Sequence, residues 1–194
     1  YYLKTTFREE LDAGDTTVLS PVLTMHDSYE ECAPALIDMA LRMGVPANES
    51  HRAYADACCR QRGFEDDVRR LGEEALARLR DDSSLRGIVL FGRSYNALAD
   101  EANMGIPHKV ASRGNLVIPL DMLPSDEYPV DRTLFWANAQ RIMKGARFVV
   151  EHERLFGFYI TNFSCGPDSF VISYFRNVMR SEEHTSELQS LLII

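Results

Sequence analysis

The sequence has 194 residues, enough for a medium-sized domain with a sizeable core, and its composition is ordinary for a globular protein. Its formal net charge of −8, with no basic block, argues against nucleic acid as a partner. No apolar run approaches the roughly 18 residues that a membrane-spanning helix needs, so no membrane insertion is expected.

The first 82 residues are predicted to form a mainly helical segment, the incomplete N-terminal part of the fold. The apolar run at residues 18–25 is β-like, but Pro21 inside it indicates an edge strand or a loop. Ser28, followed three residues later by a glutamate, predicts a capped helix, and Gly44 predicts its end.

A second helix is expected from about residue 48 to residue 80, because apolar side chains recur there at helical spacing. Its predicted buried face contains Tyr54, Cys58, Val68, Leu71, Ala75 and Leu79. Cys58 shares this face with Tyr54, so core packing is the preferred interpretation for its thiol. Cys58 and Cys59 are adjacent, which does not match a redox CxxC motif, and the role of Cys32 stays open.

The pattern changes at residues 83–179, where short apolar runs alternate with helical segments. Strands are expected at 87–92, 116–122 and 157–164, and helices at 104–113, 131–151 and 167–179. Such alternation indicates a parallel sheet with right-handed crossovers, and continuous apolar runs are typical of buried parallel strands. The sequence therefore predicts an α/β fold, a Rossmann-like lobe of βα units that follows the helical segment.

The C-terminal residues 180–194 are predicted not to belong to this fold. The run RSEEHTSELQS, residues 180–190, resembles the conceptual translation of a DNA-sequencing adapter. We therefore expect an adapter-derived artefact here and exclude it from the predicted fold. Because the chain begins with Tyr rather than Met, we also expect it to be a fragment of a larger protein.

Ligands of open α/β sheets bind beyond the carboxyl ends of the strands. The loops at residues 92–109, 121–129 and 161–169 follow the three predicted strands, and we expect them to share one edge of the sheet. Neither GxGxxG nor GxxxxGK[ST] occurs, so a dinucleotide site or an ATP-binding P-loop is not predicted.

Cys165 lies in the third of these loops, between a predicted strand and a predicted helix. Pro167 suits the first turn of that helix, and the positive end of the helix dipole favours a thiolate beside it. Three interpretations stay open from the residues alone: a buried apolar filler, a nucleophile and a metal ligand. A nucleophile needs a base within hydrogen-bond reach, and His108 is the nearest candidate.

The first loop contains a second group of candidate ligand-binding residues. Arg93 can hold a phosphate or a carboxylate through paired hydrogen bonds, and Tyr95 and Asn96 can orient a ligand or cap the following turn. In the alternative interpretation, Arg93 pairs with Asp100 or Glu101 and only shapes its own loop.

Two long segments resemble a known family: VLFGRSYNALADEANMGIPHKVASRG, residues 89–114, and YITNFSCGPDSF, residues 159–170. They are similar to proteins known as acyl-CoA dehydratase activase-related, or CoA-substrate-specific enzyme activases. The later half of those proteins is similar to the iron–sulfur subunits of 2-hydroxyacyl-CoA dehydratases. The likeness extends over about residues 20–179.

The resemblance implies that Cys165 is a ligand of a [4Fe–4S] cluster, with Asn162 and Ser164 placed to donate hydrogen bonds to sulfur. It implies that the other ligands and the ATP-binding activase domains lie outside these residues, so that the fragment alone is inactive. The implied function is low-potential electron transfer to a CoA thioester or a partner iron–sulfur protein, in the cytoplasm of an anaerobe. The alternative is a non-catalytic module that binds a CoA ligand or a partner.

Overall fold

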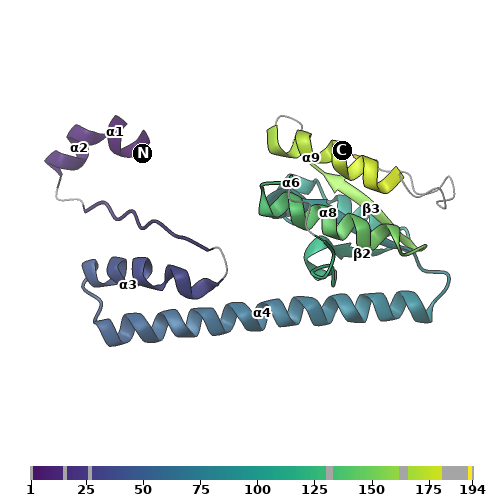
Figure 1. Cartoon of the computed structure of the whole chain (residues 1–194), viewed down its shortest axis with the longest axis horizontal. Coiled ribbons are helices and arrows are strands. Elements are labelled where there is room, and N and C mark those ends of the chain that lie inside the picture. Colours follow the sequence, from purple (N-terminus) through teal and green to yellow (C-terminus); the bar gives the residue numbers. More distant parts are fainter. Residues whose placement is uncertain are drawn as a thin grey trace. The chain divides into compact units, whose positions relative to one another are not determined.

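The computed structural model describes residues 2–14, 17–25, 28–129, 133–161, 166–180 and 192–193. The chain divides into two compact units, Tyr1–Glu65 and Asp66–Ile194, which we call the helical unit and the α/β unit (Figure 1). A helical segment therefore precedes a parallel α/β fold, which confirms the predicted fold class. The finer division at residues 82 and 179, and the adapter origin of the tail, stay predictions.

The helical unit contains short helices and the first part of one long helix. Its elements are α1 (Tyr2–Thr6), α2 (Arg8–Ala13), the 3-10 helix η1 (Tyr29–Cys32), α3 (Ala33–Arg42) and the start of α4 (Ala47–Asp81). The β-like run forms no strand, since residues 17–25 are irregular coil around Pro21. Gly44 ends α3 with a φ of +83°, as predicted, whereas the Ser28 side chain makes no cap hydrogen bond among the described residues.

Helix α4 confirms the second predicted helix almost residue for residue, and its predicted buried face is confirmed except at Leu71. Leu76 and Leu79 are buried, whereas Leu71 is 42% exposed. The reason is the next residue, Gly72, whose missing side chain lets α4 approach the backbone of Met122 closely. A Cβ atom at Gly72 would lie 1.7 Å from the Met122 carbonyl oxygen.

The sheet has the strand order β2-β1-β3-β4, and all pairings are parallel. Its strands are β1 (Gly87–Gly92), β2 (Leu116–Pro119), β3 (Leu155–Ile160) and the two-residue β4 (Leu192–Ile193). Gly87 at the start of β1 lies opposite both Leu116 and Leu155. β2 is shorter than predicted because Pro119 has no N–H to continue the ladder, and the 3-10 helix η2 (Leu120–Met122) follows it.

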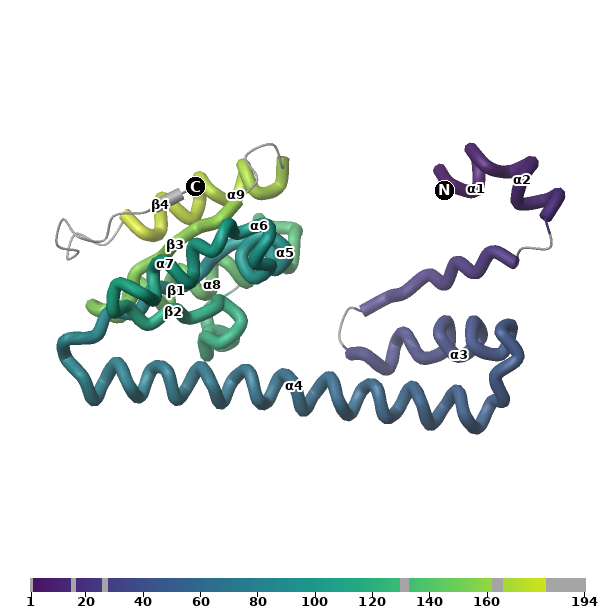
Figure 2. The backbone as a smooth tube through the Cα atoms, turned by 180° about the vertical axis from the view of Figure 1, so that it is seen from behind, coloured from purple at the N-terminus to yellow at the C-terminus, as the bar shows by residue number. Residues whose placement is uncertain are grey.

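Helices cover both faces of the sheet. Helices α8 (Ala137–Val150) and α9 (Gly166–Arg180) lie side by side on one face, as Figure 1 shows. The other face, seen in Figure 2, is covered by α7 (Ile106–Ala111), which packs Ile106 against Leu90, Phe158 and Ile160. The sheet is therefore the middle of three layers.

Two helices differ from their predicted extents for local backbone reasons. The expected helix at residues 104–113 starts only at Ile106, because Met104 and Gly105 are left-handed, with φ of 54° and 65°. Short helices α5 (Ser94–Ala97) and α6 (Asp100–Asn103) precede it. The expected helix at 131–151 starts at Ala137.

An aromatic cluster lies at the centre of the α/β core, between the sheet and α9. The Phe175 ring packs 4.7 Å from Phe91 and 5.2 Å from Tyr159, measured between ring centroids, and all three side chains are fully buried. Gly157 makes room for it, since a Cβ there would lie 3.0 Å from the Phe175 ring. In the part of the chain that the structure describes, no helix is long and apolar enough to cross a membrane.

Candidate functional site

The strands β1, β2 and β3 are parallel, so their carboxyl ends share one edge of the sheet. We call the segments that leave this edge, beginning at Arg93, Leu120 and Thr161, the carboxyl rim. The structure thus confirms that the three predicted loops start from one edge. The first and the third are joined directly, through Arg93 and Asp168.

Asp168 lies in the first turn of α9, and only 3% of its side chain is exposed. The Arg93 Nε donates a hydrogen bond to Asp168 Oδ1 at 2.8 Å, and the Thr161 hydroxyl donates to Oδ2 at 3.4 Å. A buried carboxylate needs such partners, and its position at a helix N-terminus favours its charge further. The acid that pairs with Arg93 here therefore comes from the third loop rather than from its own loop.

The other predicted residues of the first loop separate in space. The Tyr95 ring lies 6.0 Å from the Arg93 guanidinium carbon and is 56% exposed, whereas Asn96 is buried. The His108 side chain is 80% exposed on α7, where its Nε2 lies 3.8 Å from Asp100 Oδ1. Arg93 and Tyr95 thus lie together, and Asn96 belongs to the interior of the loop.

Sequence reasoning missed Asn103, which organises this loop. Asn103 is 1% exposed, its amide nitrogen donates to the Ala97 carbonyl at 3.1 Å, and its Oδ1 accepts from the Gly105 N–H at 2.9 Å. An asparagine two residues before a glycine is a common signal for a turn of this kind, so the AsnMetGly run could have identified it.

The second loop is tied to α8 by several contacts. Lys144 donates to the Asp126 carbonyl at 2.7 Å, and Arg147 donates to the carbonyl of Pro129. Asp121 forms an ion pair with Arg141, and burial lowers the pKa of that arginine from its ordinary value. The contacts fix the loop against the helix, and the Asp121 carboxylate has a structural partner in Arg141.

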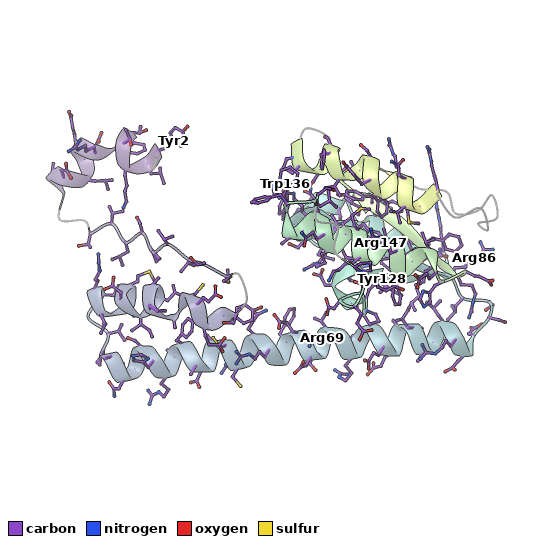
Figure 3. All side chains as sticks on the ribbon, viewed as in Figure 1. Tyr2, Arg69, Arg86, Tyr128, Trp136 and Arg147 are labelled. Carbon is purple, nitrogen blue, oxygen red and sulfur yellow. The ribbon has the colours of Figure 1, made fainter. Side chains whose placement is uncertain are left out.

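Tyr128 anchors the same loop, and Figure 3 labels it beside α8. Its hydroxyl donates a hydrogen bond to Glu151, and its ring packs edge-on against Phe148 with centroids 6.0 Å apart. Burial, the hydrogen bond to Glu151 and the negative charge of Glu151 together raise the pKa of Tyr128 to about 12.

We expect Tyr128→Phe to remove a phenol that ionises only at unusually high pH. A pKa raised in the folded state means that the neutral phenol is favoured, so its stabilising contribution is complete below about pH 10, the ordinary value, and is lost as pH rises toward about 12. Absorbance at 295 nm measures tyrosinate, and the difference between wild-type and variant titrations should have its midpoint near 12. A midpoint near 10, the ordinary value, would contradict the raised pKa.

The third loop contains the residues of the predicted cluster site. Cys165, Asn162 and Ser164 lie outside the described residues, so their predicted roles stay predictions. Their described neighbours are Thr161, directly after β3, and Gly166, the first residue of α9. Within the described residues, no group of three or more His, Cys, Asp or Glu side chains could hold a metal ion.

The remaining cysteines belong to the helical unit. Cys32 is buried and donates a hydrogen bond from its Sγ to the Thr24 carbonyl at 3.2 Å. Cys58 is buried on α4, which confirms its predicted place in the core, and Cys59 is exposed. None of these three thiols follows a strand.

An exposed aromatic group flanks the starts of α8 and α9. The Trp136 and Phe170 rings pack edge to face with centroids 5.8 Å apart, and 44% and 42% of these residues is exposed. Phe135, next to Trp136, is 91% exposed. Figure 3 shows Trp136 at one end of the α/β unit. Aromatic side chains grouped at a surface are typical of binding sites.

Two cavities among the described residues lie away from the carboxyl rim. In the α/β unit, a cavity of about 320 Å³ is lined partly by Leu79, His152 and Leu155, at the start of β3 and so away from the carboxyl rim. In the helical unit, a cavity of about 530 Å³ lies between Ile37 of α3 and Tyr54 of α4. Neither is lined by a predicted site residue, so the carboxyl rim remains the candidate site.

Comparison with known proteins identified one similarity. Residues 1–123 match the model of a family described as CoA enzyme activase uncharacterised domain (DUF2229). The match covers the helical unit and the α/β unit through β1, β2 and the end of η2. No curated protein and no solved structure matches the chain.

Proposed function

The chain belongs to the CoA enzyme activase domain family, and from this premise we propose that Cys165 is one ligand of a [4Fe–4S] cluster in an activase-type protein. The observation that carries the proposal is the start of α9 at Gly166, directly after Cys165. The free N–H groups and positive dipole end of a 15-residue helix favour the thiolate form, which is the form that binds iron.

Of the residues in this sequence, the proposal assigns only Cys165 as a ligand of such a cluster. The described part of the chain contains no group of three metal-binding side chains, and Cys32, Cys58 and Cys59 belong to the helical unit. The proposal therefore assigns the other ligands to parts of the full-length protein outside these residues. The proposal likewise places ATPase activase domains elsewhere in the same full-length chain and assigns no ATP site to these residues.

When bound, the cluster would supply low-potential electron transfer to a CoA thioester or to the cluster of a partner protein. The chain's own residues would tune and surround it. Asn162 and Ser164 would donate hydrogen bonds toward sulfur. The loop with Arg93, Tyr95 and His108 would contact the bound CoA thioester. The proposed setting is the cytoplasm of an anaerobe.

The test uses a full-length family member that carries this segment, prepared without oxygen. We expect Cys165→Ala to lower the iron content and change the cluster's visible and electron paramagnetic resonance spectra. The matched control is Cys59→Ala, which removes an exposed thiol of the helical unit and should leave both unchanged. Iron content and spectra that survive in Cys165→Ala would overturn the ligand assignment.

A second candidate function is a non-catalytic module that binds a CoA ligand or a partner. The exposed aromatic side chains Phe135, Trp136 and Phe170 favour it, because adenine rings and apolar partner surfaces pack well on such groups. Binding of coenzyme A to an iron-free preparation, lost in Trp136→Ala, would support this candidate. Absence of binding would count against a CoA ligand.

A further inference from the structure

We propose that the helical unit binds an uncharged aliphatic chain in the cavity between α3 and α4, a site separate from the carboxyl rim and independent of the proposed cluster. The two helices lie side by side here (Figure 1), and the cavity between them has a volume of about 530 Å³. Ligand sites in proteins are concave, mostly apolar and about 300–1,000 Å³ in volume, so this cavity has the size of a binding site.

The middle of the cavity is lined by small, aliphatic or aromatic side chains. These are Ala33, Pro34, Ile37, Tyr54, Ala55 and Cys58. The two alanines leave open the space that larger side chains would fill in a closely packed helix pair. The Tyr54 hydroxyl is already engaged, because it donates a hydrogen bond to the Tyr29 carbonyl. A buried cysteine packs as a small apolar group, so hydrocarbon is the ligand surface that these walls favour.

The charged groups of the lining lie at its two ends. Along α4, His51 comes first and Arg62 last, so about 16 Å of helix separates them at a rise of 1.5 Å per residue. Arg62 donates a hydrogen bond to the Glu30 carboxylate, which lines the same end, so these two charges cancel. An uncharged chain complements such a cavity, since it leaves the ion pair intact and buries no charge without a partner.

The cavity is braced at both ends, so a ligand does not have to create it. At the start of α4, buried Ser50 donates from its hydroxyl to the Pro46 carbonyl at 3.0 Å and fixes the turn between the helices. At the other end, the Tyr29 hydroxyl donates to the Glu65 carboxylate and ties η1 to α4. A pre-formed cavity binds its ligand without the entropic cost of ordering its walls.

The first test measures the binding of straight-chain alcohols, from 1-hexanol to 1-decanol, to a full-length family member by isothermal titration calorimetry. We expect each added CH₂ group to tighten binding about fourfold, the factor that its burial supplies. Carboxylates of the same chain length should bind no more tightly than the alcohols. Absence of binding, or carboxylate binding that is independent of chain length, would overturn the proposal.

Two alanine variants of α4 then locate the site. Ala55→Leu fills the cavity from one wall, and we expect it to weaken the binding of 1-decanol at least about 10-fold, because the added atoms overlap with the chain. Ala57→Leu adds the same atoms two residues away, at an exposed position outside the cavity lining, and should leave the affinity unchanged. Equal affinities in the two variants would place the ligand elsewhere and overturn the assignment.

Two adjacent cysteines keep the proposal testable if Ala55→Leu fails to fold. Cys58 is buried and lines the cavity, whereas Cys59 is exposed and does not line it. At ten times its Kd, 1-decanol should slow the reaction of Cys58 with iodoacetamide about tenfold, because only the ligand-free fraction reacts, and the rate at Cys59 should not change. An unchanged rate at Cys58 would overturn the site. None of these measurements depends on iron, so the cluster proposal stands or falls separately.

Discussion

Replacing Phe175 by alanine is expected to lower the free energy of unfolding of the α/β unit by about 3–5 kcal/mol. The Phe175 ring is fully buried and contacts both Phe91 and Tyr159. Its removal would leave a cavity between α9 and the sheet. Gly157 faces the same space and has no side chain to fill it, so the cavity cannot collapse easily. Urea unfolding followed by circular dichroism at 222 nm measures the change.

The matched control is Phe170→Ala on the same helix. Phe170 is 42% exposed and contacts Trp136 and Tyr174 at the surface, with ring centroids 5.8 and 4.9 Å away. Loss of these aromatic contacts should reduce stability by about 1 kcal/mol. Equal effects of the two variants would show that Phe175 is not the centre of the core.

Gly72→Ala is expected to destabilise the α/β unit by about 2 kcal/mol, although alanine is the better helix former by about 1 kcal/mol. The new methyl group would lie 1.7 Å from the carbonyl oxygen of Met122, and backbone atoms cannot move aside as a flexible side chain can. Either α4 or η2 must then shift. Trp136 is the only tryptophan of the sequence and lies in this unit, so its fluorescence reports the unfolding.

Gly63→Ala adds the same methyl group to the same helix, at a position where no other segment packs closely. Apart from its chain neighbours and the backbone of its own helix, no described atom lies within 4 Å of the position of its added Cβ. Here helix propensity alone should act, and we expect α4 to gain up to about 1 kcal/mol, measured by circular dichroism. Effects of the same sign at Gly63 and Gly72 would contradict the close contact with Met122.

The sequence predicted the sheet well because its signals are local. The run from Gly87 to Gly92 is a short apolar stretch bounded by glycines, and it forms β1 over those same residues. Helix α4 was likewise predictable from its apolar spacing. The exposure of Leu71 was not, because the neighbouring Gly72 faces Met122, a residue far away in the sequence.

The sequence predicted where the candidate site lies, but not which of its residues contact one another. Strand ends located the carboxyl rim, but the contact between Arg93 and Asp168 joins residues from two loops and leaves no periodic trace in the sequence. The sequence suggested only Asp100 or Glu101 as the partner of Arg93, and not Asp168. Asn96 was expected at a ligand and is instead buried, because short helices α5 and α6 turn it inward.

The position of β1 in the sheet bears on how the protein is made. β1 is synthesised before β2 and β3, yet it lies between them, with Gly87 opposite residues of both. On the ribosome its apolar run must wait with one edge unpaired until β3 emerges and pairs along the whole of β1. Such late, non-local pairing slows folding and leaves an aggregation-prone strand edge exposed. The α/β unit is therefore expected to expose an aggregation-prone edge of β1 for as long as translation has not passed β3.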